Sequence, residues 1–159
     1  MHLTRTFARD LSLFRQGLSL LREIGPHGLG EMVRVAEFLE RAIYEEGSFR
    51  TTSDGFQFRL LNPPMRMGAF SSAQLSLDGR PLPVETSYVQ EEGAPARRAL
   101  SELSRASPLH FRPGRPTLFQ SRCPDLVAGS RHTLQLSLQS VAIPPRVWMR
   151  FTDELRRGL

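Results

Sequence analysis

The sequence predicts an α+β protein in which an N-terminal helical hairpin is followed by an antiparallel β-sandwich. Over residues 6–46, apolar residues recur every three to four positions, which is typical of helices that bury one face. From residue 55 onward they alternate with polar residues, which is typical of strands with one buried face. This change of period divides the chain into a helical appendage, 1–47, and a sandwich domain, 48–159.

The predicted hairpin consists of two amphipathic segments. Over residues 6–24 an apolar stripe repeats at helical spacing from Leu11 onward, and the Gly-Pro-His-Gly run at 25–28 ends it. A second apolar face follows over residues 30–46. We expect these helices to lie antiparallel, with their shared apolar face covered by the rest of the chain or by a second copy of it.

Five strands are predicted from alternation of apolar and polar residues. They are residues 55–61, 70–77, 116–123, 132–140 and 146–155. The clearest is 132–140, where Leu134, Leu136 and Leu138 form one face and glutamine and serine form the other. Several short alternating strands separated by turn residues indicate a sandwich.

Asp78-Gly79 predicts a tight β-hairpin, because both residues tolerate the positive φ of a type I′ turn. Pro81 and Pro83 in the returning strand cannot donate ladder hydrogen bonds, so that strand is expected to be short or to lie at a sheet edge. Residues 86–107 are then predicted to be a long irregular loop with one helical turn. Loops of this length in compact domains are often functional.

The composition favours an ordinary globular protein, with 40% hydrophobic and 23% charged residues. The single cysteine, Cys123, excludes an internal disulfide and is interpreted as a structural thiol. Charged residues interrupt the N-terminal segment every few positions, which argues against a signal peptide or a membrane span. The cytoplasm is therefore the expected compartment, and no membrane is expected as a partner.

All 21 basic residues are arginine, and the net charge is +5. Residues 1–47 contain six arginines and seven acids, whereas residues 48–159 contain fifteen arginines and nine acids. The positive charge therefore belongs to the sandwich. The absence of lysine is typical of biased coding, so the charge alone is weak support for binding nucleic acid.

Motifs that would carry chemistry are missing from the sequence. The four histidines have no metal-ligand spacing, and neither a Gly-x-Ser-x-Gly elbow nor a phosphate-binding loop occurs. We therefore expect no metal, no cofactor and no catalytic residues. Six residues are instead candidates for binding a ligand or a partner. They are Arg97, Arg98 and Arg105 in the long loop, His132 at the start of a strand, and the cluster of Trp148 with Arg150 on the last strand.

The order of the turns and strands resembles a known family. The matching residues are Asp78-Gly79 with Pro83, then Pro108, Phe111 and Gly114, then Leu126, Gly129 and His132 leading into Leu134 and Leu136, and finally Phe151 with Asp153. This pattern over about residues 55–154 resembles the β-subunit-like domain of bacterial C-glycoside deglycosidases. The resemblance implies a small sandwich whose metal and acid/base residues belong to a separate, barrel-shaped α subunit. The predicted helical hairpin lies outside the pattern.

Three functional hypotheses follow. The first is a noncatalytic interaction subunit, possibly of a C-glycoside-cleaving enzyme, that is held by another protein or by a second copy of itself. The second is a homo-oligomeric protein that binds nucleic acid or another polyanion through its arginines, and such binding must weaken steeply with salt. The third is an enzyme that uses His132 and a neighbouring acid as an acid/base pair.

Overall fold

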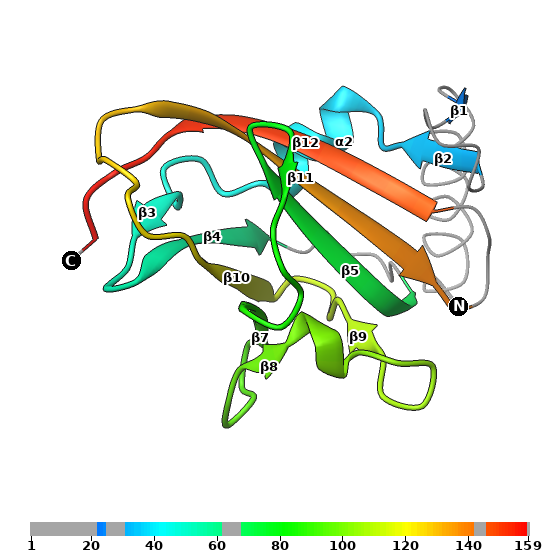
Figure 1. Ribbon diagram of the computed structural model, residues 1–159. Coiled ribbons are helices and arrows are strands. Elements are labelled where there is room, and N and C mark those ends of the chain that lie inside the picture. The colour runs from blue at the N-terminus through cyan, green and yellow to red at the C-terminus, as the bar shows by residue number, and fades with distance from the viewer. Residues whose placement is uncertain (1–21, 25–30, 62–67, 142–145, 159) are drawn as a thin grey trace.

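Two β-sheets pack face to face in the computed structural model, which describes residues 22–24, 31–61, 68–141 and 146–158 (Figure 1). The first sheet has the order β1-β2-β12-β11-β5-β6, with β9 also paired to β5. Its strands are β1 (Arg22–Ile24), β2 (Glu31–Arg34), β5 (Ala69–Leu77), β6 (Arg80–Pro81), β9 (Leu109–His110), β11 (Arg131–Ser140) and β12 (Arg146–Glu154).

The second sheet has the order β3-β4-β10-β7-β8. Its strands are β3 (Arg50–Thr51), β4 (Gly55–Leu61), β7 (Ser87–Glu91), β8 (Arg98–Ala99) and β10 (Pro116–Arg122). The described residues also include one α-helix, α2 (Glu37–Ile43), and one short 3₁₀ helix, η1 (Leu100–Glu102). No helix among these residues is long and apolar enough to cross a bilayer.

The predicted N-terminal helical hairpin is wrong, and the described fold is mostly β. Arg22–Ile24, where the first helix was expected to end, is β1. The second expected helix, 30–46, is divided into strand β2 and the seven-residue α2. Residues 6–21 of the first expected helix lie outside the described residues. Tertiary pairing explains the change, because β2 pairs with both β1 and β12, and such pairing overrides local helical spacing.

The strand predictions for the later part of the chain are confirmed by β4, β5, β10, β11 and β12. The Asp78-Gly79 turn is also confirmed, since the two residues have φ of 50° and 82° and join β5 to β6. As expected from its prolines, β6 is short and lies at a sheet edge. The expectation of an irregular loop over 86–107 is only partly correct, because β7, β8 and η1 give that segment regular structure.

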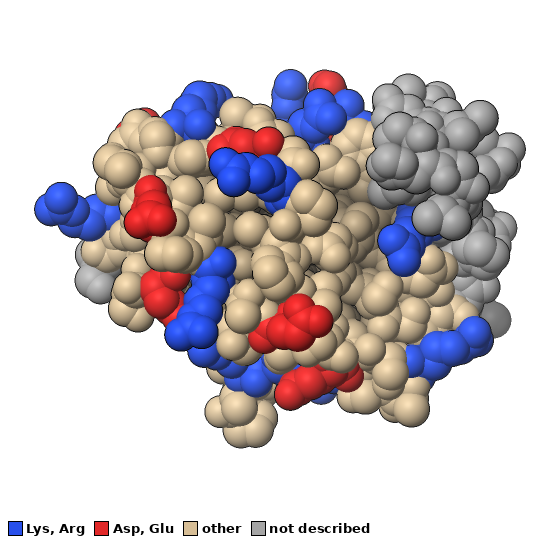
Figure 2. Space-filling model, viewed as in Figure 1, with Lys and Arg blue, Asp and Glu red and all other residues tan. Residues whose placement is uncertain are grey.

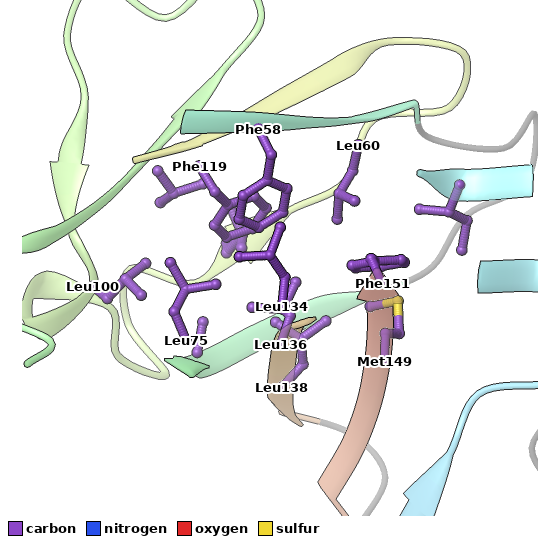
Figure 3. Close-up of a cluster of buried hydrophobic side chains, with 14 of the residues drawn as sticks. Phe58, Leu60, Leu75, Leu100, Phe119, Leu134, Leu136, Leu138, Met149 and Phe151 are labelled. Atoms are coloured by element: carbon purple, nitrogen blue, oxygen red, sulfur yellow. The ribbon is translucent and has the colours of Figure 1, made fainter. Parts of the chain in front are cut away.

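Phenylalanine and leucine side chains from the two sheets form the core (Figure 3). Phe58 of β4 and Phe119 of β10 stack with ring centroids 5.4 Å apart. They face leucines of the first sheet, among which Leu75, Leu134 and Leu136 are completely buried. Each such side chain stabilises the fold by about 1.5–3 kcal/mol through removal from water.

Helix α2 packs beside β12 and β4 and closes one side of the sandwich (Figure 1). Its Leu39 and Ile43 join the core, whereas its Glu40 is buried beside the backbone of β12. β2 pairs with β12 only as far as Trp148, so the next edge amide needs another acceptor. The Glu40 carboxylate accepts the N–H of Arg150 and also the Arg34 guanidinium, at 3.2 Å. A side chain thus takes the place of a strand partner.

Replacing Glu40 by alanine should destabilise the protein by about 2–4 kcal/mol, because it leaves a backbone N–H and the Arg34 guanidinium without their acceptor. Glu37→Ala on the same helix is the matched control. Its carboxylate is exposed and 3.9 Å from Arg41, so that change should cost less than about 0.5 kcal/mol. Urea unfolding of both variants measures the difference, and equal losses would contradict the role of Glu40.

Candidate functional site

A groove of about 530 Å³ lies between α2 and the outward side chains of β11 and β12. Ionisable side chains dominate its lining. They are Arg34, Arg41, Arg131 and Arg150 together with Glu37, Glu40 and Glu46. Two ion pairs, Arg34–Glu40 and Arg41–Glu37, are formed within this set. The guanidinium groups of Arg131 and Arg150 form no ion pair with any described carboxylate.

Two predicted site residues, Trp148 and Arg150, lie at this groove or directly behind it. Trp148 is 4% exposed, so it is not the open stacking surface that the sequence suggested. The guanidinium carbons of Arg34 and Arg150 lie over its ring, 5.2 and 5.4 Å from the centroid. Cation–π contact with the indole holds both arginines in place. Arg150 is therefore exposed and ordered at the same time.

Beside the groove, Asp153 connects β12 to the segment that follows α2. Its carboxylate accepts hydrogen bonds from the Tyr44 hydroxyl at 2.7 Å, from the Gly47 N–H at 3.0 Å and from the Glu154 N–H at 2.8 Å. Burial alone would raise the pKa of Asp153, but these bonds outweigh it and hold the pKa below its usual value. Burial, reinforced by this carboxylate, raises the pKa of Tyr44, so the phenol stays protonated.

His132 lies away from the groove, in a hydrogen-bonded series with Asp78 and Ser130. Its Nδ1 is 2.6 Å from Asp78 Oδ2, and its Nε2 is 2.7 Å from Ser130 Oγ. The Ser130 hydroxyl also donates to the carbonyl of Val127 at 2.6 Å. These bonds join the β5–β6 turn to the loop before β11, across 54 residues of sequence. The same order of groups occurs in serine hydrolases.

The single proton of the Ser130 hydroxyl determines what this series can do. When it is donated to Val127, the serine oxygen accepts from Nε2–H and the imidazole carries both protons. When the imidazole is neutral, Nδ1 keeps its proton toward Asp78 and Nε2 accepts from Ser130. Only the second state resembles an activated nucleophile, and the bond to Val127 competes with it. The observed geometry therefore favours a structural connection.

The arginines of the 86–107 segment have separate positions. Arg98 is used internally, because it bonds to Glu91 at 3.2 Å and to the carbonyl of Pro108 at 3.0 Å. Arg105 donates to the carbonyl of Val141. Arg97 is exposed, and its guanidinium carbon stacks 3.9 Å above the Tyr88 ring. These three residues do not form one site.

Several residues at these positions were not recognised as functional from the sequence. Arg34 and Glu40 lie in the segment 30–46 that was predicted to be a helix and were not candidate site residues, and Asp78 was explained fully by its turn. Register on β11 and β12 brings Arg131 and Arg150 to one groove, which no spacing in the sequence indicates.

Among the described residues, no three His, Cys, Asp or Glu side chains are grouped closely enough to hold a metal ion. Burial raises the pKa of Cys123, so that thiol stays protonated.

No protein-family model matches the chain, and neither does any curated protein sequence.

The hydrogen bonds to Asp78 predict a pH effect on stability. The Thr133 N–H and then the His132 imidazole hold the pKa of this carboxyl below its usual value of about 3.9. Its contribution is therefore complete above pH 4 and is lost as the pH falls through the lowered pKa. Asp78→Asn should lower the melting temperature at pH 7 by up to about 4 °C, since the half-exposed carboxylate is screened by water.

The difference between this variant and the unmodified protein should shrink as the pH falls below about 4 and should approach zero once the pH is below the lowered pKa of Asp78. Asp125→Asn is the matched control, because Asp125 also occupies a turn with positive φ, and asparagine accepts that backbone. Its effect should be small and independent of pH. A constant difference for Asp78→Asn from pH 7 to pH 3 would contradict the assigned bonds.

Proposed function

We propose that this chain is a noncatalytic β-sandwich subunit that binds another protein, a carbohydrate-processing enzyme of the C-glycoside-cleaving class. The observation that carries the proposal is structural. The residues that resemble the deglycosidase β-subunit pattern serve as turns, connections and core. Residues with these roles maintain a scaffold. The catalytic residues of the proposed reaction then belong to the partner enzyme.

The roles of these residues are specific. Gly79, Gly114 and Gly129 have φ of 82°, 70° and 96°, which favours glycine. Asp78 and His132, which come from two separate parts of the pattern, meet at 2.6 Å. The final aspartate of the pattern, Asp153, holds the Tyr44 hydroxyl and the Gly47 N–H. Two aromatic members, Phe111 and Phe151, are buried in the core.

The outer face of the second sheet supplies a surface for the partner. Arg97 stacks on Tyr88 of β7, and its guanidinium donates to Gln120 of β10 at 3.0 Å. Gln120 in turn donates to Gln57 of β4 at 3.2 Å. An ordered, exposed arginine on an aromatic ring loses little entropy on binding, and arginine and tyrosine are common anchors of protein interfaces.

Binding of nucleic acid or another polyanion has weaker support. In the part of the chain that the structure describes, five arginines are paired with carboxylates, which interrupts a continuous basic surface. They are Arg34, Arg41, Arg59, Arg98 and Arg122. On the face shown in Figure 2, arginines and acids are interspersed around a largely uncharged centre. A strong site for phosphate backbones needs clustered positive charge.

Capture from the native cells tests the proposed function. The tagged chain is expected to retain a barrel-type sugar enzyme at both 0.15 and 0.6 M sodium chloride, and depletion of the complex should remove C-glycoside-cleaving activity from the extract. A packed protein interface should respond weakly to salt, whereas phosphate contacts weaken steeply. The proposal would be contradicted if the tagged chain retained nucleic acid and no enzyme, and if that nucleic acid were released at the higher salt concentration. Cleavage by the purified chain that His132→Ala abolishes would support the enzymatic hypothesis instead.

Arg97→Ala should weaken binding to the captured enzyme by about tenfold or more, because it removes an exposed anchor. Its stability should change by less than about 1 kcal/mol, since the exposed side chain stacks on Tyr88 and donates one hydrogen bond to Gln120. Arg115→Ala, an exposed arginine in the β9–β10 turn, is the control and should bind normally. Surface plasmon resonance compares the three proteins. Equal affinity of all three would place the interface elsewhere.

A further inference from the structure

We propose that the groove between α2 and β12 binds the carboxylate of an acidic sugar, with Arg131 and Arg150 holding the negative group. The choice of a sugar rests on the proposed function, whereas the choice of a single negative charge comes from the groove itself. The site belongs to this chain alone, so it can be tested without the partner enzyme.

Arg131 and Arg150 approach the groove from two directions. In the register of β11 with β12, Arg131 is opposite Glu154, Thr133 is opposite Thr152 and Gln135 is opposite Arg150. The two arginines therefore lie on either side of Thr152, on the outward face of the sheet, and all three line the groove. Both side chains line this one groove, where a guanidinium group can hold a planar carboxylate by charge-assisted hydrogen bonds.

The indole of Trp148 lies against two arginines of the groove lining. The guanidinium groups of Arg150 and Arg34 both lie over the Trp148 ring. The Nε of Arg34 is buried and has no hydrogen-bond partner among the described residues. Glu40 pairs with Arg34, and Glu37 pairs with Arg41, so Arg131 and Arg150 are the lining arginines that form no ion pair with a described carboxylate. Their guanidinium groups can donate hydrogen bonds to a ligand.

The carboxylates of the groove decide which kind of anion fits. Glu37 and Glu46 are exposed in the lining, where they can accept hydrogen bonds from ligand hydroxyls. They would repel a polyanion, since like charges at close range are unfavourable. A molecule with one negative charge and several hydroxyls matches both requirements. A sugar carboxylate meets this description, whereas nucleic acid and inorganic phosphate do not.

Nuclear magnetic resonance titration of the full chain at low ionic strength tests the site, with sodium glucuronate as the probe. We expect saturable shifts of the amide signals of Arg131, Arg150 and Thr152. Glucose, which lacks the carboxylate, and inorganic phosphate, which lacks the sugar ring and its alcohol hydroxyls, should each bind at least about tenfold more weakly. Arg131→Gln and Arg150→Gln should each weaken glucuronate binding about tenfold or more.

Arg146→Gln is the matched control, because Arg146 is on the same strand but outside the groove, bonded to Gln139. It should retain affinity within about twofold. The proposal is overturned if glucuronate gives no saturable shifts, if phosphate binds as well as glucuronate, or if Arg146→Gln weakens binding as much as the groove variants. Failure here leaves enzyme capture and the Arg97→Ala result unaffected, so the two proposals fail separately.

Discussion

The unpaired edge of β12 is the constraint from which the rest of this end of the molecule follows. β2 accompanies β12 only to Trp148, and the Arg150 N–H just beyond it is satisfied by the buried carboxylate of Glu40. A buried carboxylate needs a positive partner, and Arg34 of β2 supplies it. These bonds fix α2 at one distance from β12. The groove exists because the helix is held beside the strand by a side chain, with no intervening backbone ladder.

The pairing of β2 with two other strands explains why the prediction of a helical hairpin was wrong. The apolar residues Val35, Leu39 and Ile43 recur at helical spacing, but only the last two lie in α2, and all three join the core of the sandwich. β2, just before them, lies in a segment with the same apparent period, yet its neighbours in space are β1 and β12. Local spacing therefore cannot separate a short helix after a strand from one continuous helix.

The later strands could be predicted because their information is local. Alternation on β11 places Leu134, Leu136 and Leu138 inward without reference to other elements, and Asp78-Gly79 specifies its own turn. The candidate site could be predicted only in part, and Arg150 was found because an aromatic residue stands near it in sequence. Arg34, Arg131 and Glu40 could not be found in this way. Their association depends on register between strands and on one buried carboxylate, neither of which leaves a periodic signal.

The two proposed binding surfaces belong to different sheets, which bears on how a subunit of this kind could work. Arg97 and Tyr88 lie on the outer face of the second sheet, at β7 and β8, whereas the groove lies beside α2 and β12 of the first. Figure 1 shows β7 and β8 well apart from α2. The phenylalanine and leucine core separates them. A partner docked at Arg97 would leave Arg131 and Arg150 open. The subunit could therefore hold an acidic sugar while it is bound to an enzyme, and any coupling between the two events would have to pass through the core.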